Sequence, residues 1–194
     1  MFCNLGLYVI YHIEHPFFER YKVSPKPWPW HKNREEWNAL LTNTILIVAV
    51  NNLLCIPLAI CLESLYFQHK VPYTTDLESL PTPLVLLVTI PFCILVEDMS
   101  NSSTHWLFHR KWLYPFVHKV HHQHVDSIGL ASEYAHPIEF MFGNLTAISL
   151  GPFILQKHIH LYTVMLWYFI RISETIDVHS GYDFSWSPFR LIPF

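Results

Sequence analysis

Two groups of histidines lie close together in the middle of the chain. His105 and His109 are four residues apart, and His118, His121 and His122 follow as a second group. Residues three or four apart share one face of a helix, so each group would present its imidazoles in a common direction. Neutral imidazole is a frequent ligand of iron, zinc and copper. The spacing therefore predicts two neighbouring helices that hold a metal between them.

The residues around these histidines narrow the choice of metal. A zinc protease normally carries HExxH, with the glutamate as general base, and that motif does not occur in the chain. The cysteines form no CxxC pair and lie in apolar runs, at Cys3, Cys55, Cys61 and Cys93. An all-nitrogen site with an open position fits iron and dioxygen better than structural zinc. The alternative is a solvated histidine-rich loop that binds no metal.

The elements that must position these histidines are strongly apolar. Hydrophobic residues make up 52% of the 194 residues and charged residues 14%, whereas a soluble domain has about 25% charged residues. The net charge of −3 gives no indication of a nucleic-acid partner. Five apolar runs are candidate membrane helices, at residues 1–13, 39–62, 81–96, 138–155 and 159–172.

The length of each run determines whether it could cross a membrane as a helix. Only residues 39–62 reach the length of about 20 residues that a membrane-crossing helix needs. The shorter runs would have to tilt or extend into flanking residues, or else form buried helices of a soluble protein. Pro115 suits the first turn of a second histidine helix. We therefore expect an all-α fold, a polytopic membrane helical bundle with a histidine-rich helical metal region.

Basic residues are distributed unevenly over the loops. Lys and Arg are frequent in residues 14–38 and 97–137, but residues 63–80 contain only Lys70, and the turn after residue 155 contains Lys157. The positive-inside rule places the two basic loops in the cytosol. Every candidate metal ligand would then face the cytosol.

Three segments resemble a known family. They are residues 118–122 (HKVHH), 131–139 (ASEYAHPIE) and 174–183 (ETIDVHSGYD). They are similar to the membrane di-iron superfamily of sterol desaturases and fatty acid hydroxylases, and within it to the methylsterol monooxygenases, the C-4 methylsterol oxidases. The resemblance runs from about residue 18 to the end of the chain.

The resemblance implies a set of site residues. The ligands of two iron ions would include His105, His109, His118, His121 and His122. His136 and His179 would be additional ligands, hydrogen-bonding partners of ligands, or substrate contacts. Further side chains would orient the ligating imidazoles or be charges at the membrane interface, namely Glu133, Glu139, Glu174 and Asp177.

The resemblance also implies an activity and partners. The chain would be a multi-pass protein of the endoplasmic reticulum membrane, a non-haem di-iron monooxygenase that oxidises the C-4 methyl group of 4-methylsterols with O2. Electrons would come from NAD(P)H through cytochrome b5 and its reductase, because the chain has no dinucleotide-binding fingerprint. The alternatives are a fatty acyl hydroxylase or desaturase of the same superfamily, and a catalytically inactive, truncated membrane paralogue.

The sequence departs from the family pattern in two places. The third histidine box, an HHxxHH-like run, does not occur before Phe194, so we expect residues 1–194 to form a single membrane domain of the fatty acid hydroxylase type that is incomplete at both ends. Residues 99–104 separate Glu97 and Asp98 from the first histidine, which is four residues more than in the family. This insertion, about 1.1 helical turns, would displace both acidic side chains. His124 lies outside the pattern and is expected to be solvated.

Overall fold

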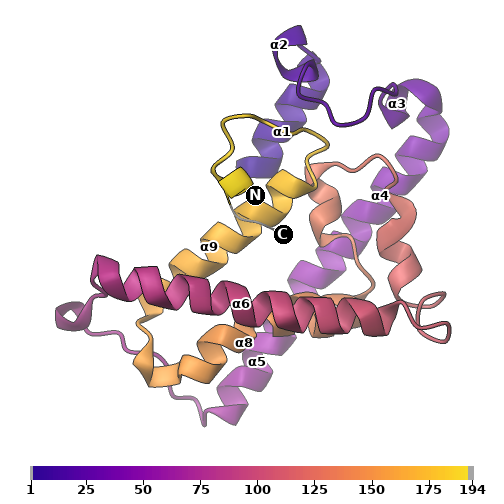
Figure 1. Cartoon of the computed structure of the whole chain (residues 1–194). Coiled ribbons are helices and arrows are strands. Elements are labelled where there is room, and N and C mark those ends of the chain that lie inside the picture. Colours follow the sequence, from indigo (N-terminus) through magenta and orange to yellow (C-terminus); the bar gives the residue numbers. More distant parts are fainter. Residues whose placement is uncertain (1, 192–194) are drawn as a thin grey trace.

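The computed structural model describes residues 2–191, which fold into helices joined by turns (Figure 1). The long helices are α1 (Phe2–Ile13), α4 (Arg34–Val50), α5 (Ile56–Tyr66), α6 (Pro83–Phe108), α8 (Thr146–Leu155) and α9 (Leu161–Val178). The short ones are α2 (Pro16–Glu19), α3 (Pro29–Lys32) and α7 (Pro137–Glu139). Two π-helical segments are η1 (Asn51–Cys55) and η5 (Phe140–Leu145). The 3-10 segments are η2 (Leu77–Ser79), η3 (His118–Gln123), η4 (Gly129–Glu133), η6 (Gln156–His158) and η7 (Pro188–Leu191). The expected all-α fold is confirmed.

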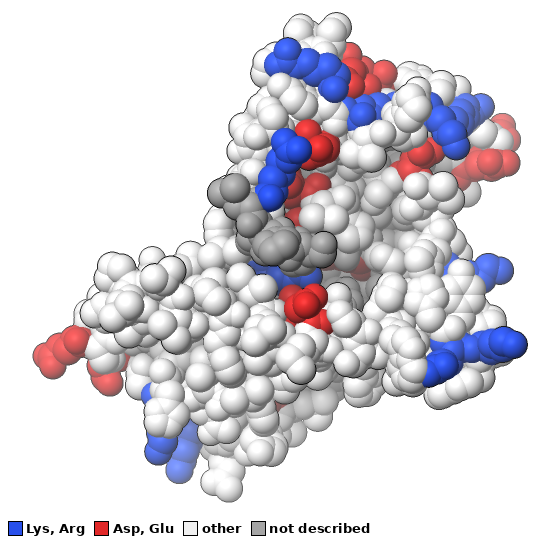
Figure 2. Space-filling view, viewed as in Figure 1, with Lys and Arg blue, Asp and Glu red and all other residues white. Residues whose placement is uncertain are grey.

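Three helical stretches are long and apolar enough to cross a membrane. They are Arg34–Tyr66, Pro83–Phe108 and Pro137–His158. Arg34–Tyr66 and Pro137–His158 contain the predicted runs 39–62 and 138–155, and Pro83–Phe108 contains all but the first two residues of the run 81–96. Each stretch extends its run into flanking residues, as expected for the shorter runs. Figure 2 shows that charged side chains gather around the N-terminal elements and at the outer ends of the molecule, whereas the face over α6 is largely uncharged. Such a face suits the hydrocarbon core of a bilayer.

The remaining two apolar runs behave differently from these spans. Residues 1–13 give α1, which is a shorter apolar helix. Residues 159–172, which include Arg171, contribute to α9, and this helix continues to Val178 and so also includes the charged residues Glu174 and Asp177. Of the five predicted runs, these two are therefore not membrane-crossing candidates within residues 2–191.

Local signals in the sequence set the helix starts. The side chain of Asn33 accepts hydrogen bonds from the backbone N–H groups of Glu35 and Glu36 and so begins α4. At the start of α6, the Thr82 hydroxyl accepts the N–H of Val85, and Pro83 occupies the first turn. Capping residues and an N-terminal proline stabilise a helix start because the first N–H groups lack partners inside the helix.

The spans pack closely where α6 meets α8. Gly151 of α8 lies against Cys93 of α6, which is fully buried. The same core contains Trp167 of α9, whose indole N–H donates to the carbonyl of Ile148 at 2.8 Å. A small residue at such a contact lets two helix backbones approach each other.

We therefore expect Gly151→Ala to destabilise the chain. A Cβ atom at position 151 would lie 3.0 Å from both Cα and Sγ of Cys93. Overpacking of this kind costs about 1–3 kcal/mol, which exceeds the gain in helix propensity of about 1 kcal/mol. The measurement is thermal unfolding in detergent. Gly6→Ala in α1 is the matched control, because no atom lies within 4 Å of its new Cβ. Equal melting temperatures for the two variants would contradict the close contact.

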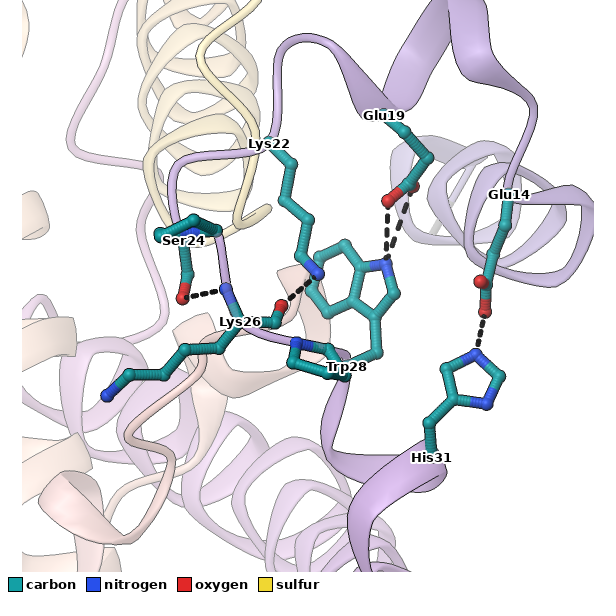
Figure 3. Close-up of a pocket in the computed structure, with 9 residues that line it drawn as sticks. Glu14, Glu19, Lys22, Ser24, Lys26, Trp28 and His31 are labelled. Carbon is teal, nitrogen blue, oxygen red and sulfur yellow. Dashed lines mark hydrogen bonds and ion pairs between the residues drawn. The ribbon is translucent and has the colours of Figure 1, made fainter.

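The N-terminal elements are tied to the segment that follows α9. Glu19 accepts hydrogen bonds from the indole of Trp28 at 3.3 Å and from the hydroxyl of Tyr182 at 2.5 Å. The ammonium of Lys22 lies over the Trp28 ring, 4.2 Å from its centroid, and donates to the carbonyl of Lys26 (Figure 3). These contacts hold the chain after His179 against the N-terminal region.

Candidate metal centre

The first histidine pair lies at the end of α6, as the spacing predicts. His105 is in the last turn of the helix, and His109 is the residue that caps it. Their Nε2 atoms are 3.1 Å apart, and both side chains are exposed. The helix therefore delivers both imidazoles to one point at the end of a candidate membrane span.

The second group does not form the expected α-helix. Residues His118–Gln123 are the 3-10 segment η3, and Pro115 lies in the turn that precedes it. A longer helix is not required to orient this segment, because two of its histidines form hydrogen bonds with residues outside it. His118 contacts the Glu139 carboxylate, and His121 contacts the carbonyl oxygen of Tyr134.

His118 lies at the centre of the histidine cluster. Its Nε2 atom is 3.2 Å from Nε2 of His109 and 3.0 Å from Nε2 of His122. The ligand atoms of His105, His109 and His118 all lie within 4.8 Å of one another. His118 is completely buried, whereas the other three imidazoles are exposed. The cluster is therefore closed on the His118 side and open on the other.

The hydrogen bonds of His118 determine what its Nε2 atom can do. Nδ1 lies 2.6 Å from Oε1 of Glu139, and with the ionised carboxylate as acceptor Nδ1 carries the proton and Nε2 keeps a lone pair. Burial, and then the neighbouring imidazoles, lower the pKa of His118 to about 3, so the ring is neutral at pH 7. This lone pair faces two other nitrogens.

A metal ion fits this arrangement of nitrogens. Metal–nitrogen bonds of about 2.0–2.1 Å separate neighbouring ligand nitrogens by about 2.9–3.4 Å in tetrahedral or octahedral coordination. The observed Nε2–Nε2 distances around His109 and His118 are 3.0–3.2 Å. A cation would also remove the repulsion between lone pairs that converge on one point.

His121 lies next to both His118 and His179. Its ring centroid is 5.9 Å from that of His118 and 5.7 Å from that of His179. Nδ1 of His121 donates to the carbonyl of Tyr134 at 3.1 Å, and Nδ1 of His179 donates to the carbonyl of Thr175 at 2.8 Å. Burial lowers the pKa of His121 to about 4 and also lowers that of His179. Both imidazoles are neutral at pH 7, with the Nε2 lone pairs available.

The other candidate side chains have partners outside the cluster. His136 caps α7, since its Nδ1 accepts the N–H of Ile138 at 3.2 Å. Glu133 accepts a hydrogen bond from the amide of Asn52 at 2.6 Å. Asp177 accepts one from the hydroxyl of Ser187 at 2.7 Å. Of the four predicted acidic residues, Glu139 is the one that the structure brings to an imidazole through a hydrogen bond.

Two ion pairs of Arg171 connect α9 to α6 and to a second residue of α9. Arg171 forms an ion pair with Glu97 of α6, with Nε and Oε2 2.9 Å apart, and a second ion pair with Glu174. Asp98, next to Glu97, is exposed. Glu174 is therefore a partner of Arg171 in this structure rather than of a ligating imidazole.

The expectation that His124 is solvated is wrong. Its side chain is buried, and its Nε2 atom lies 2.7 Å from the hydroxyl of Thr44 in α4. The Thr44 hydroxyl donates to the carbonyl of Leu40, so Nε2 of His124 carries the proton of this contact. Sequence reasoning missed the partner because it lies eighty residues away, on the first span. The available signal was a set of polar residues inside an apolar run, Asn43, Thr44, Asn51 and Asn52.

Comparison with known proteins identifies the family to which the segment with the histidine cluster is similar. The family model described as fatty acid hydroxylase matches residues 90–193. That segment contains both histidine groups, Glu139 and His179. The chain belongs to the fatty acid hydroxylase family. The family membership and the three spans together make this chain a multi-pass membrane protein.

Several relatives carry names that describe a reaction. The chain is 35% identical to methylsterol monooxygenase 1 of Gallus gallus and 34% identical to methylsterol monooxygenase 1 of Danio rerio, in each case over 182 residues. These matches cover 92% of the chain and 57% and 58% of the two relatives. Very-long-chain aldehyde decarbonylase GL1-11 of Oryza sativa subsp. japonica is 42% identical over 118 residues, or 60% of the chain and 43% of that relative. No solved structure matches the chain. The expected resemblance is confirmed, and the chain spans less than two thirds of the length of these relatives.

Proposed function

We propose that this chain provides the metal-binding part of a membrane-bound non-haem di-iron monooxygenase that oxidises the C-4 methyl group of 4-methylsterols. The observation that carries this proposal is the convergence of imidazole nitrogens on His118, at 3.0 and 3.2 Å. The relatives named methylsterol monooxygenase support the sterol substrate. Bound iron would supply the activation of O2 that attack on an unactivated C–H bond requires.

The chain's own residues have distinct roles in this proposal. One iron ion is held by His105, His109, His118 and His122. His121 and His179, with their free Nε2 atoms, contribute to the second iron site. Glu139 keeps the proton of His118 on Nδ1 and so keeps Nε2 available as a ligand.

The exposure of the cluster sets the access to it. The cluster is closed on the side of the completely buried His118, and water is excluded there. The exposed imidazoles on the other side leave that face open to O2 and to a sterol held among the apolar spans. No Rossmann fingerprint occurs in the chain, so electrons come from NAD(P)H through cytochrome b5 and its reductase.

The proposal includes a location, the endoplasmic reticulum membrane, with the histidine cluster facing the cytosol. Val125 lies beside the cluster and is 88% exposed, and Leu77, in a loop expected on the other side, is 83% exposed. In a background in which Cys3 and Cys61 are serine, we expect Val125→Cys in sealed microsomes to react with an impermeant maleimide. Leu77→Cys should react only after permeabilisation. The reverse pattern would contradict the cytosolic orientation.

The function is tested by metal content and products together. The protein is produced in microsomes with cytochrome b5 and its reductase, and is supplied with a 4-methylsterol. We expect two irons per protein by elemental analysis, and oxidised C-4 methyl products by mass spectrometry. Zinc instead of iron would overturn the di-iron centre, and iron without a sterol product would overturn the substrate.

A second candidate substrate class follows from the rice relative. Its 42% identity over 118 residues exceeds that of the methylsterol monooxygenases. A long-chain aldehyde is therefore assayed beside the sterol, together with a fatty acyl substrate. Conversion of the aldehyde or the acyl chain, with the sterol unchanged, would favour these activities over sterol oxidation.

A further inference from the structure

A stripe of polar side chains on the first span lies against the segment that follows the second histidine group. Its members are Asn43, Thr44, Asn51 and Asn52, all within Arg34–Tyr66. Asn51 is completely buried, and its amide donates to the carbonyl oxygens of Glu133 at 3.2 Å and Ala135 at 2.9 Å. A buried amide is costly unless it forms hydrogen bonds, and both N–H groups of Asn51 form them here.

The two carbonyls that Asn51 binds flank the carbonyl that binds His121. The carbonyl of Tyr134 accepts the Nδ1 proton of His121 at 3.1 Å. Tyr134 is itself fully buried, and its hydroxyl accepts from the amide of Asn43 and donates to Gln123, both at 2.6 Å. The peptide that orients His121 is therefore fixed from the first span on both sides of the accepting oxygen.

The helix geometry at Asn51 is unusual. Asn51 is the first residue of the π-helical segment η1, and π-helical turns occur frequently at functional sites. The second such segment, η5, begins directly after Glu139, the partner of His118, and the two segments contact each other. Each π-helical segment thus starts beside a residue whose hydrogen bonds lead to a cluster histidine.

We propose that Asn51 is a positioning residue of the metal centre. Its amide holds residues 133–135 so that the carbonyl of Tyr134 keeps the proton of His121 on Nδ1 and leaves Nε2 for the metal. This inference rests on the proposed function, because it takes His121 as a ligand. Asn51 acts on His121 through the peptide and not through direct contact.

The test uses Asn51→Leu, which removes both amide donors and keeps the number and branching of the side-chain heavy atoms. Co2+ is titrated into the metal-free, full chain in detergent, and its visible absorption spectrum is followed. We expect Asn51→Leu to bind Co2+ about 10-fold more weakly than the parent, which is the lower end of the range for groups that orient metal ligands. We also expect the visible absorption spectrum of bound Co2+ to change. Asn52→Leu is the matched control: the neighbouring amide binds the Glu133 side chain, so affinity and spectrum should not change.

A double-mutant cycle with His121→Ala separates positioning from general support of the fold. If Asn51 acts through His121, Asn51→Leu should cause no further loss of Co2+ affinity in the His121→Ala background. The same loss in both backgrounds, or no loss in a folded Asn51→Leu protein, would overturn the proposal. If Asn51→Leu does not fold, the cycle is run with Asn51→Ala. Unchanged Co2+ binding by His121→Ala alone would instead refute its role as a ligand, and with it the proposed second iron site.

Discussion

His118→Ala is expected to abolish iron binding and, with it, oxidation of the substrate. His118 contributes the nitrogen that lies 3.0–3.2 Å from two other Nε2 atoms. Loss of groups that only orient ligands costs about 10–100-fold in metal affinity, so loss of this central ligand should cost about 100-fold or more. The measurements are iron per protein by elemental analysis and a Co2+ titration.

Two further variants control for damage to the fold. His118→Ala also leaves the buried Glu139 without its imidazole, so the metal-free variant is compared with the parent by thermal unfolding. His122→Ala removes an exposed imidazole at the same point and should lose affinity with little change in stability. His69→Ala, an exposed histidine near Ser64, should change neither property. Full iron content in a folded His118→Ala protein would contradict the metal centre.

Glu139→Gln is expected to lower metal affinity by about 10–100-fold while leaving the shape of the site intact. The amide oxygen of Gln can still accept the Nδ1 proton of His118, but Gln cannot supply the negative charge that would increase the basicity of the imidazole when a metal ion is bound. Glu139 is buried with His118, so solvent does not screen this charge effectively. The measurement is the dissociation constant for Co2+ and the position of its absorption band.

Glu63→Gln provides the matched comparison. Glu63 is also a span carboxylate with a neutral hydrogen-bond donor, the hydroxyl of Tyr73 at 3.0 Å, and it contacts no cluster histidine within residues 2–191. Its substitution should leave Co2+ affinity unchanged. An equal effect of both substitutions would show that loss of charge in the spans, rather than the contact with His118, determines affinity.

The parts of this site that the sequence predicts are those set by local geometry. His105 and His109 converge because both lie on one continuous helix, whose period fixes their relation. The three spans follow from the apolar runs for the same reason, since length and composition are local properties. The roles of α1 and α9 follow less directly, because α9 continues beyond its apolar run through the charged residues Glu174 and Asp177.

The parts that the sequence does not predict depend on distant partners. His118 and His121 are oriented by different acceptors, the Glu139 carboxylate and the carbonyl of Tyr134, and no helical period relates these acceptors. His124 is buried because Thr44 of the first span provides its hydrogen-bond partner. The three imidazoles of the second group nevertheless stay together, with ring centroids 4.6–5.9 Å apart.

The contacts between the N-terminal region and the end of α9 determine the order of events during synthesis. Tyr11 donates to the carbonyl of Ser180, 169 residues later, and Glu19 accepts from Tyr182, 163 residues later. At about 5–20 residues per second, the ribosome needs about 10–30 s to make that intervening chain. The N-terminal helix is therefore synthesised long before its partners exist. His179 lies directly before those partners, so the proposed second iron site is completed only after α9 has been synthesised.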